Sequence, residues 1–174
     1  MFMGGLVGAI VSGSLWLLSA ALGTWSSPRR GIAALVIGGS FIFPLMVLLL
    51  RAMGRRASLS AGNPLGGLAM QVAFTIPLSY PLIAAATIHR LNWFYPAFMI
   101  VVGAHYLPFV FLYGMWQFAV LSVLLVGGGV AIGIAMPDAF SLGGWLTGLV
   151  LLLFAFVGRS IALRPERQEA PPAS

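Results

Sequence analysis

The sequence carries little charge: 7% of its 174 residues are charged and 60% are hydrophobic. A soluble domain needs about 25% charged residues, because its surface faces water. The shortage of charge excludes a soluble globule and indicates that lipid surrounds most of the molecule, in agreement with a mean hydropathy of +1.04. We therefore predict an all-α integral membrane protein whose main partner is the lipid bilayer.

Cysteine and lysine are both absent. Without cysteine there is no disulfide, no thiolate metal site and no cysteine nucleophile. The two His and three acidic residues are too few for most metal clusters, so we expect neither a metal nor another cofactor. The apolar stretches contain no acid pair, metal triad or Ser/His/Asp set, so we assign no catalytic residue and do not expect an intramembrane enzyme.

The nine basic residues are all Arg, and they lie at the ends of apolar runs. That placement is typical of the charge bias that orients membrane proteins, and it does not indicate nucleic-acid binding. Abundant Ala, Gly and Arg without Lys is associated with GC-rich bacterial genomes. We therefore predict a multi-pass protein of the bacterial inner membrane.

The apolar runs divide into membrane-spanning lengths, each of about 20 residues. Residues 93–136 form one apolar stretch of 44, which is too long for a single crossing, and "YGMWQ" (113–117) is the predicted break. We predict a polytopic bundle within a single domain, residues 1–160, and a polar, disordered cytoplasmic tail at 161–174. The six predicted spans are residues 4–25, 28–50, 64–88, 93–114, 117–136 and 140–158.

Two turns carry signals for the start of a helix. Ser27 and Asn63 are predicted caps, because their side chains can accept hydrogen bonds from the first backbone N–H groups. Each is followed by a proline, Pro28 or Pro64, which suits the first helical position.

Six spans place both termini on one side of the membrane. We predict that both termini are cytoplasmic, because that orientation puts six Arg inside and three outside. The inner group is Arg51, Arg55, Arg56, Arg159, Arg164 and Arg167, and the outer group is Arg29, Arg30 and Arg90.

Three polar residues lie four apart on one face of the predicted third span: Gln71, Thr75 and Ser79. Polar side chains at membrane depth face other helices or a wet cavity. The stripe therefore predicts either hydrogen bonds between helices or the lining of a pathway.

His105 lies in the middle of the predicted fourth span, about 18 Å of helix from either end. An ionisable residue at that depth favours a functional role, and Pro108 frees the backbone carbonyl of Ala104 nearby. Three roles stay open: a structural hydrogen bond, the handling of a proton or substrate, and ligation of a metal or haem.

Three tyrosines of the same span share one helix face: Tyr95, Tyr106 and Tyr113. Tyr95 and Tyr113 suit the membrane surface, where the hydroxyl reaches water. Tyr106 is too deep for that role and needs a hydrogen-bond partner inside the protein.

A basic cluster is predicted at the outer surface: Arg29, Arg30, His89 and Arg90, next to Asp138. Two helix N-termini are expected at the same surface, so the cluster predicts an anion site. The alternative is that Asp138 caps the sixth span and neutralises one Arg.

Pairs of glycines four residues apart mark three predicted spans: Gly4 and Gly8, Gly129 and Gly133, and Gly144 and Gly148. Small residues let helices approach each other closely. The pairs predict packing within the chain or, alternatively, a homo-oligomer formed through one of these faces.

The segment "LNWFYPAFMIVVGAHYLPFVFLYGM" (91–115) resembles a block that recurs in a family of small, uncharacterised bacterial multi-pass membrane proteins with a domain of unknown function. "NPLGGLAMQ" (63–71), "FIFPL" (41–45) and "FSLGGWLTG" (140–148) are similar to the same pattern. The resemblance covers most of the chain and implies a membrane-embedded helical bundle. It implies no activity and no catalytic residue.

We predict a small transporter or permeation protein for an unidentified small molecule or ion, with a wet interior lined by Gln71, Thr75, Ser79, His105 and Tyr106. The alternative is a non-catalytic membrane scaffold or accessory subunit, in which the same residues join helices. Transport predicts a polar cavity that reaches His105 from one face. A scaffold predicts a sealed, hydrogen-bonded His105 and a glycine-rich or aromatic groove on the surface.

Overall fold

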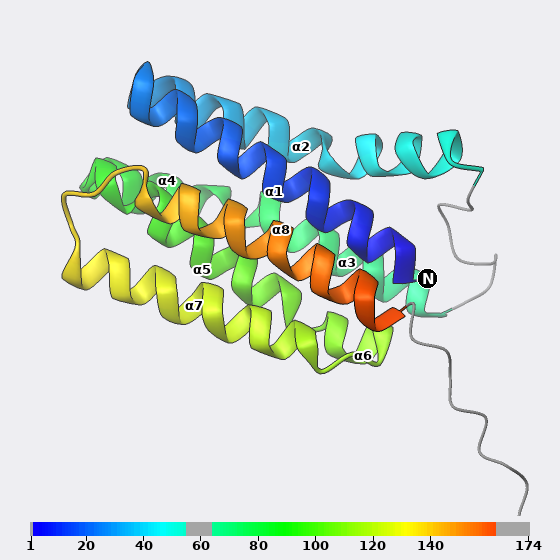
Figure 1. Ribbon diagram of the computed structural model, residues 1–174. Helices are drawn as coiled ribbons and strands as arrows, with labels where there is room; N and C mark the ends of the chain where they lie inside the picture. The colour runs from blue at the N-terminus through cyan, green and yellow to red at the C-terminus, as the bar shows by residue number, and fades with distance from the viewer. Residues whose placement is uncertain (1, 55–63, 163–174) are drawn as a thin grey trace, which may run out of the picture.

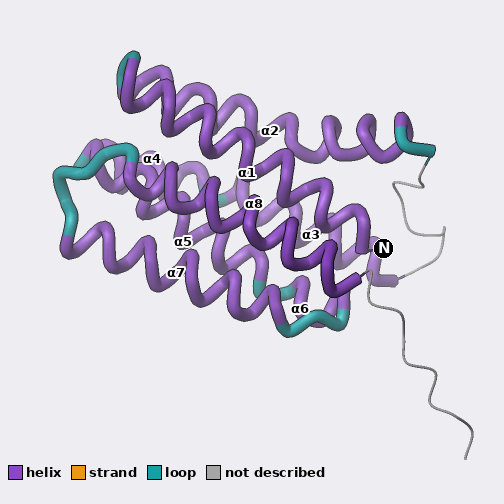
Figure 2. Tube along the Cα trace, viewed as in Figure 1, coloured by secondary structure: helices purple, strands orange, loops and turns teal. Residues whose placement is uncertain are grey.

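The computed structural model describes residues 2–54 and 64–162, and every regular element within these ranges is a helix (Figure 1, Figure 2). The all-α prediction is confirmed for this part of the chain. The predicted cap Asn63 and the part of the predicted tail beyond Ala162 lie outside the described residues. The elements are α1 (Phe2–Trp25), α2 (Pro28–Ala52), α3 (Pro64–Leu78), α4 (Tyr80–His89), η1 (Leu91–Trp93), α5 (Phe94–Tyr106), α6 (Phe109–Tyr113), α7 (Gln117–Ala135) and α8 (Leu142–Ala162).

Five segments of the described chain are long and apolar enough to cross a membrane, and they overlap the first five predicted spans. The sixth predicted span corresponds to α8, whose apolar part Leu142–Gly158 is shorter. The five segments are Val7–Trp25, Pro28–Ala52, Met70–His89, Leu91–Leu112 and Gln117–Ala135.

The long helices run along one another, so the connections gather at two ends of the bundle (Figure 1). α1 packs along both α2 and α8, and α5 packs along α7. The α1–α2 turn, the end of α4 and the α7–α8 connection lie at one end. Both ends of the described chain, the start of α1 and the end of α8, lie at the opposite end of the bundle.

Local sequence signals account for two of the connections. Ser27 has extended backbone, and its side chain accepts a hydrogen bond from the backbone N–H of Arg30 at 3.3 Å, while Pro28 opens α2. Gly114 ends α6 with φ 66°, a left-handed conformation that favours glycine. α7 begins soon after, at Gln117, so the break predicted at "YGMWQ" is present.

The third and fourth predicted spans each consist of two helices, which the sequence analysis did not predict. Ser79 separates α3 from α4, and Leu107 and Pro108 separate α5 from α6. A proline inside a helix removes a backbone donor and clashes with the preceding turn. Pro77 and Pro81 flank the first break and Pro108 lies in the second, so proline explains both interruptions.

Candidate functional site

His105 on α5 is partly buried and hydrogen-bonded to α3. Its Nδ1 lies 2.8 Å from the backbone carbonyl oxygen of Val72 and 3.2 Å from the hydroxyl of Thr75. A carbonyl oxygen can only accept, so Nδ1 carries the proton and donates it to Val72. The rings of Tyr106 and Phe109 pack edge-on against the imidazole, with centroids 5.6 and 5.0 Å away. His105 therefore joins α3 to α5.

Of the other predicted pathway residues, Thr75 and Tyr106 contact His105. The Thr75 hydroxyl donates to the Val72 carbonyl at 2.7 Å, and the Ser79 hydroxyl donates to the Thr75 carbonyl at 2.7 Å, so both bond to their own segment. Gln71 is exposed, whereas Tyr106 is buried. Within the described residues, no group of three His, Asp or Glu side chains gathers that could hold a metal ion.

A second polar cluster joins three helices in the core. The Ser19 hydroxyl of α1 lies 2.7 Å from the Gly31 carbonyl oxygen of α2 and 2.7 Å from the Tyr95 hydroxyl of α5. Because the carbonyl can only accept, Ser19 donates to Gly31 and Tyr95 donates to Ser19. Ser19 and Tyr95 both have 0% exposure. The interpretation of Tyr95 as a membrane-surface anchor is therefore wrong, and no sequence pattern had singled out Ser19.

Glycines from three helices surround the Tyr95 side chain. A Cβ added to Gly144 of α8 would lie 2.8 Å from Tyr95 Cε1, and one added to Gly31 of α2 would lie 2.9 Å from the hydroxyl. Gly23 of α1 approaches the same hydroxyl, with a distance of 3.3 Å from its Cβ position. Glycine thus lets α1, α2 and α8 reach the ring closely. The small-residue pattern in the sequence was the signal that could have located this centre.

The predicted glycine pairs of α7 and α8 face neighbouring helices of the same chain. A Cβ on Gly129 would lie 2.8 Å from the Pro96 carbonyl oxygen of α5, and one on Gly148 would lie 2.6 Å from Leu17 Cδ2 of α1. These distances are shorter than ordinary contacts, so both helices approach their neighbours at positions that need glycine. Gly129 and Gly148 therefore support packing within the chain, whereas Gly133 meets only Pro96 Cβ, at 3.5 Å.

The predicted basic cluster lies at a single end of the bundle, at the start of α2 and the end of α4: Arg29, Arg30, His89 and Arg90. Arg30 Nη1 donates to the Ser26 hydroxyl at 2.6 Å. Arg90 Nη2 lies 3.5 Å from Asp138 Oδ1, and these side chains are 44% and 93% exposed. Asp138 thus partly neutralises one Arg, as one alternative predicted, whereas α8 begins only at Leu142.

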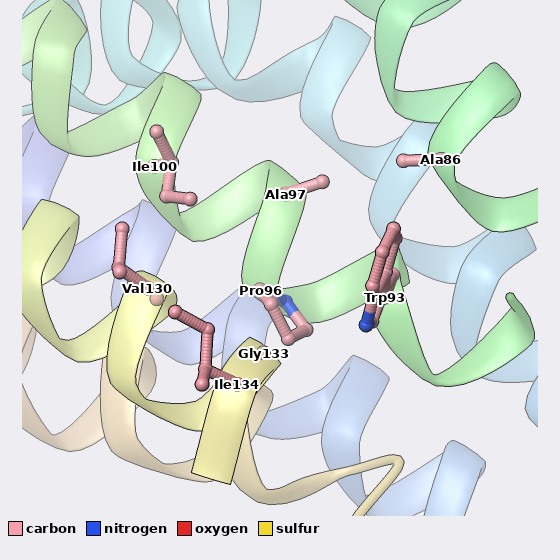
Figure 3. A pocket seen from close by; sticks show the side chains of 9 residues that line it. Ala86, Trp93, Pro96, Ala97, Ile100, Val130, Gly133 and Ile134 are labelled. Atoms are coloured by element: carbon pink, nitrogen blue, oxygen red, sulfur yellow. The ribbon is translucent and has the colours of Figure 1, made fainter. Parts of the chain in front are cut away.

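A groove of about 240 Å³ opens between α4, α5 and α7. Figure 3 shows Val130 and Ile134 of α7 on one side of it. Ala86 of α4 and Trp93 of η1 stand on the other side, and Pro96 of α5 lies between them (Figure 3). None of the predicted pathway residues lines this groove.

A family model matches residues 2–159, which include α1 to α7 and most of α8. The chain belongs to DUF7010, a family of unknown function. The helices that carry His105, Tyr95 and the groove all lie within the matched region of this DUF7010 member. No curated protein and no solved structure matches the chain.

Proposed function

We propose that this DUF7010 member is a non-catalytic membrane scaffold or accessory subunit. The hydrogen bond from His105 to the Val72 carbonyl supports the proposal most strongly, because it uses an imidazole inside a segment that can cross a membrane to hold α3 and α5 together. The hydrogen bonds that join Tyr95, Ser19 and Gly31 have the same character. A scaffold is also expected to present a glycine-rich or aromatic groove, and the α4–α5–α7 groove contains Trp93 and two glycines of α7.

A permeation protein is the second candidate, and the exposure of Gln71 and Thr75 favours it. Both side chains are exposed on α3, within a segment long and apolar enough to cross a membrane. Polar groups at membrane depth need a protein partner or water. In this candidate function, water along α3 solvates both side chains and reaches the imidazole of His105.

We also propose six spans in the bacterial inner membrane, with both termini in the cytoplasm. The end of the bundle that holds the start of α1 and the end of α8 also holds Arg51, at the end of α2. The proposed topology assigns six of the nine Arg of the sequence to the cytoplasmic side. The excess of Arg supports a cytoplasmic location for that end. Trp25 and Trp116, 76% and 67% exposed, flank α1 and α7 near opposite ends, as tryptophans at the two membrane surfaces do.

His105→Phe separates the two candidate functions. The purified variant is reconstituted in proteoliposomes under a pH gradient, and proton flux is followed with an enclosed pH-sensitive dye. For a scaffold we expect wild-type and variant flux to equal that of empty liposomes, and the free energy of unfolding to fall by about 1 kcal/mol with the lost interhelical hydrogen bond.

His89→Phe is the matched control, because it makes the same substitution at an exposed histidine at the bundle end. We expect this control to leave both flux and stability unchanged. A wild-type flux above that of empty liposomes that is lost in His105→Phe and kept in His89→Phe would establish permeation and refute the scaffold.

A further inference from the structure

We propose that the groove between α4, α5 and α7 binds an anionic phospholipid, with one acyl chain in the groove and the phosphate at Arg90. This site goes beyond the scaffold role and rests only on the proposed insertion of the chain in a membrane. It joins two features that are otherwise separate: an apolar groove and a basic group at its end.

The shape of the groove suits a hydrocarbon chain. Its volume of about 240 Å³ is lined by Ala, Gly, Pro, Val, Ile and Trp, so it offers apolar contacts to part of an acyl chain. Its lining residues run from Trp93 of η1 to Ile100 of α5, which corresponds to about 10 Å of helix. The groove is open along its side, so a chain can enter from the surrounding lipid without a rearrangement of the bundle.

Two glycines of α7 create the space that the chain occupies. Gly129 is fixed by packing, because a Cβ there would lie 2.8 Å from both the Pro96 carbonyl oxygen and Ile100 Cγ1. At Gly133 an added Cβ would meet only Pro96 Cβ, at 3.5 Å, which is an ordinary contact. A side chain at position 133 is therefore compatible with the α5–α7 packing and fills the groove instead.

One end of the groove lies at the end of the bundle, where Arg90 can recognise a phosphate. The Trp93 backbone N–H donates to the Arg90 carbonyl at 2.9 Å, which places Arg90 one turn from a lining residue. The pair between Arg90 and Asp138 is largely exposed and therefore weak, so a phosphate can take the place of the carboxylate. The Trp93 Nε1 is itself buried and does not face the groove, so the charge of Arg90 carries the recognition of the phosphate.

Lipid selectivity tests the charged part of the site. The full-length protein is reconstituted in phosphatidylcholine vesicles that contain spin-labelled phosphatidylglycerol or spin-labelled phosphatidylcholine, and electron paramagnetic resonance measures the association of each. We expect a preference for phosphatidylglycerol that falls about fivefold in Arg90→Gln and rises in Asp138→Asn. Arg29→Gln makes the same charge change at the same end on α2, which does not line the groove, and should keep the preference.

Filling the groove tests the apolar part. Gly133→Leu should reduce phosphatidylglycerol association, whereas Gly127→Leu, on the same helix with nothing within 4 Å of its Cβ position, should not.

Equal association of the two lipids with the wild type, or equal losses in Arg29→Gln and Arg90→Gln, would overturn the proposal. Displacement of phosphatidylglycerol by millimolar inorganic phosphate would also overturn it, because it would indicate a site for a free ion. A change of oligomeric state in Gly133→Leu would overturn it as well, because it would indicate that the groove holds a partner helix. Alkaline extraction of the vesicles tests insertion separately, so failure of the membrane proposal is distinguishable.

Discussion

Replacing Ser19 with Ala should destabilise the bundle more than replacing Tyr95 with Phe, although both changes remove the same side-chain hydrogen bond. In Tyr95→Phe, Ser19 keeps its bond to the Gly31 carbonyl. In Ser19→Ala, the Tyr95 hydroxyl and the Gly31 carbonyl both lose this partner, in a site where the Tyr95 side chain is 0% exposed. A buried polar group without a partner costs more than the lost bond alone.

The magnitudes follow from this difference. A single hydrogen bond in a membrane bundle contributes about 0.6–1 kcal/mol, which we expect Tyr95→Phe to lose. An unsatisfied buried hydroxyl costs about 1–3 kcal/mol, which we expect for Ser19→Ala. The double variant should cost no more than Ser19→Ala alone, because the second change removes the hydroxyl that the first leaves unpaired.

The assay is unfolding of the purified protein in detergent micelles with increasing dodecyl sulfate, followed by circular dichroism. Tyr80→Phe is the matched control, because its hydroxyl reaches the Val36 carbonyl only at 3.4 Å in a partly buried position, and it should lose less than Tyr95→Phe. Additive costs in the double variant, or a larger cost for Tyr95→Phe than for Ser19→Ala, would refute the assigned donors and acceptors.

Two further predictions concern packing and topology. Gly144→Ala should lower the free energy of unfolding by about 1–3 kcal/mol, because the new Cβ would lie 2.8 Å from the Tyr95 ring. Gly127→Ala, where nothing lies within 4 Å, should be neutral or stabilising through helix propensity, and the same titration measures both. The lack of native cysteine permits single-cysteine labelling: Met136→Cys should react with a membrane-impermeant maleimide in intact cells, and Ala52→Cys only after lysis. Equal labelling at both positions would contradict the three crossings proposed between them.

The positions of the helices were largely predictable, because they depend on local rules. Apolar run length located the segments that can cross a membrane, and Ser27 with Pro28 marked the start of α2. The break near Gly114 followed from a stretch too long for one crossing. The interruption at Ser79 was missed, since a helix interior with Pro77 can either kink or break, and the sequence does not decide which.

The surroundings of the polar residues were not predictable, because they depend on helices distant in the chain. Tyr95 lies near the end of its span, where a tyrosine commonly meets the membrane surface. Its partner Ser19 is 76 residues away, and glycines of α1, α2 and α8 allow the close approach that brings the two together. For His105, the sequence left three roles open and gave no sign of the helix that it contacts, and the structure adds the hydrogen bond to the Val72 carbonyl of α3.

The packing of α8 on α1 sets an order for biogenesis. A Cβ on Gly148 of α8 would lie 3.1 Å from the Gly13 carbonyl oxygen of α1, so the two backbones touch where the first and last helices meet. The α1–α2 hairpin can assemble while the ribosome is still translating, since its contacts are local. The interior closes only after Leu142–Ala162 has been synthesised. A chain that stops before α8 therefore leaves the surface of α1 around Gly13 uncovered and open to association with other nascent chains.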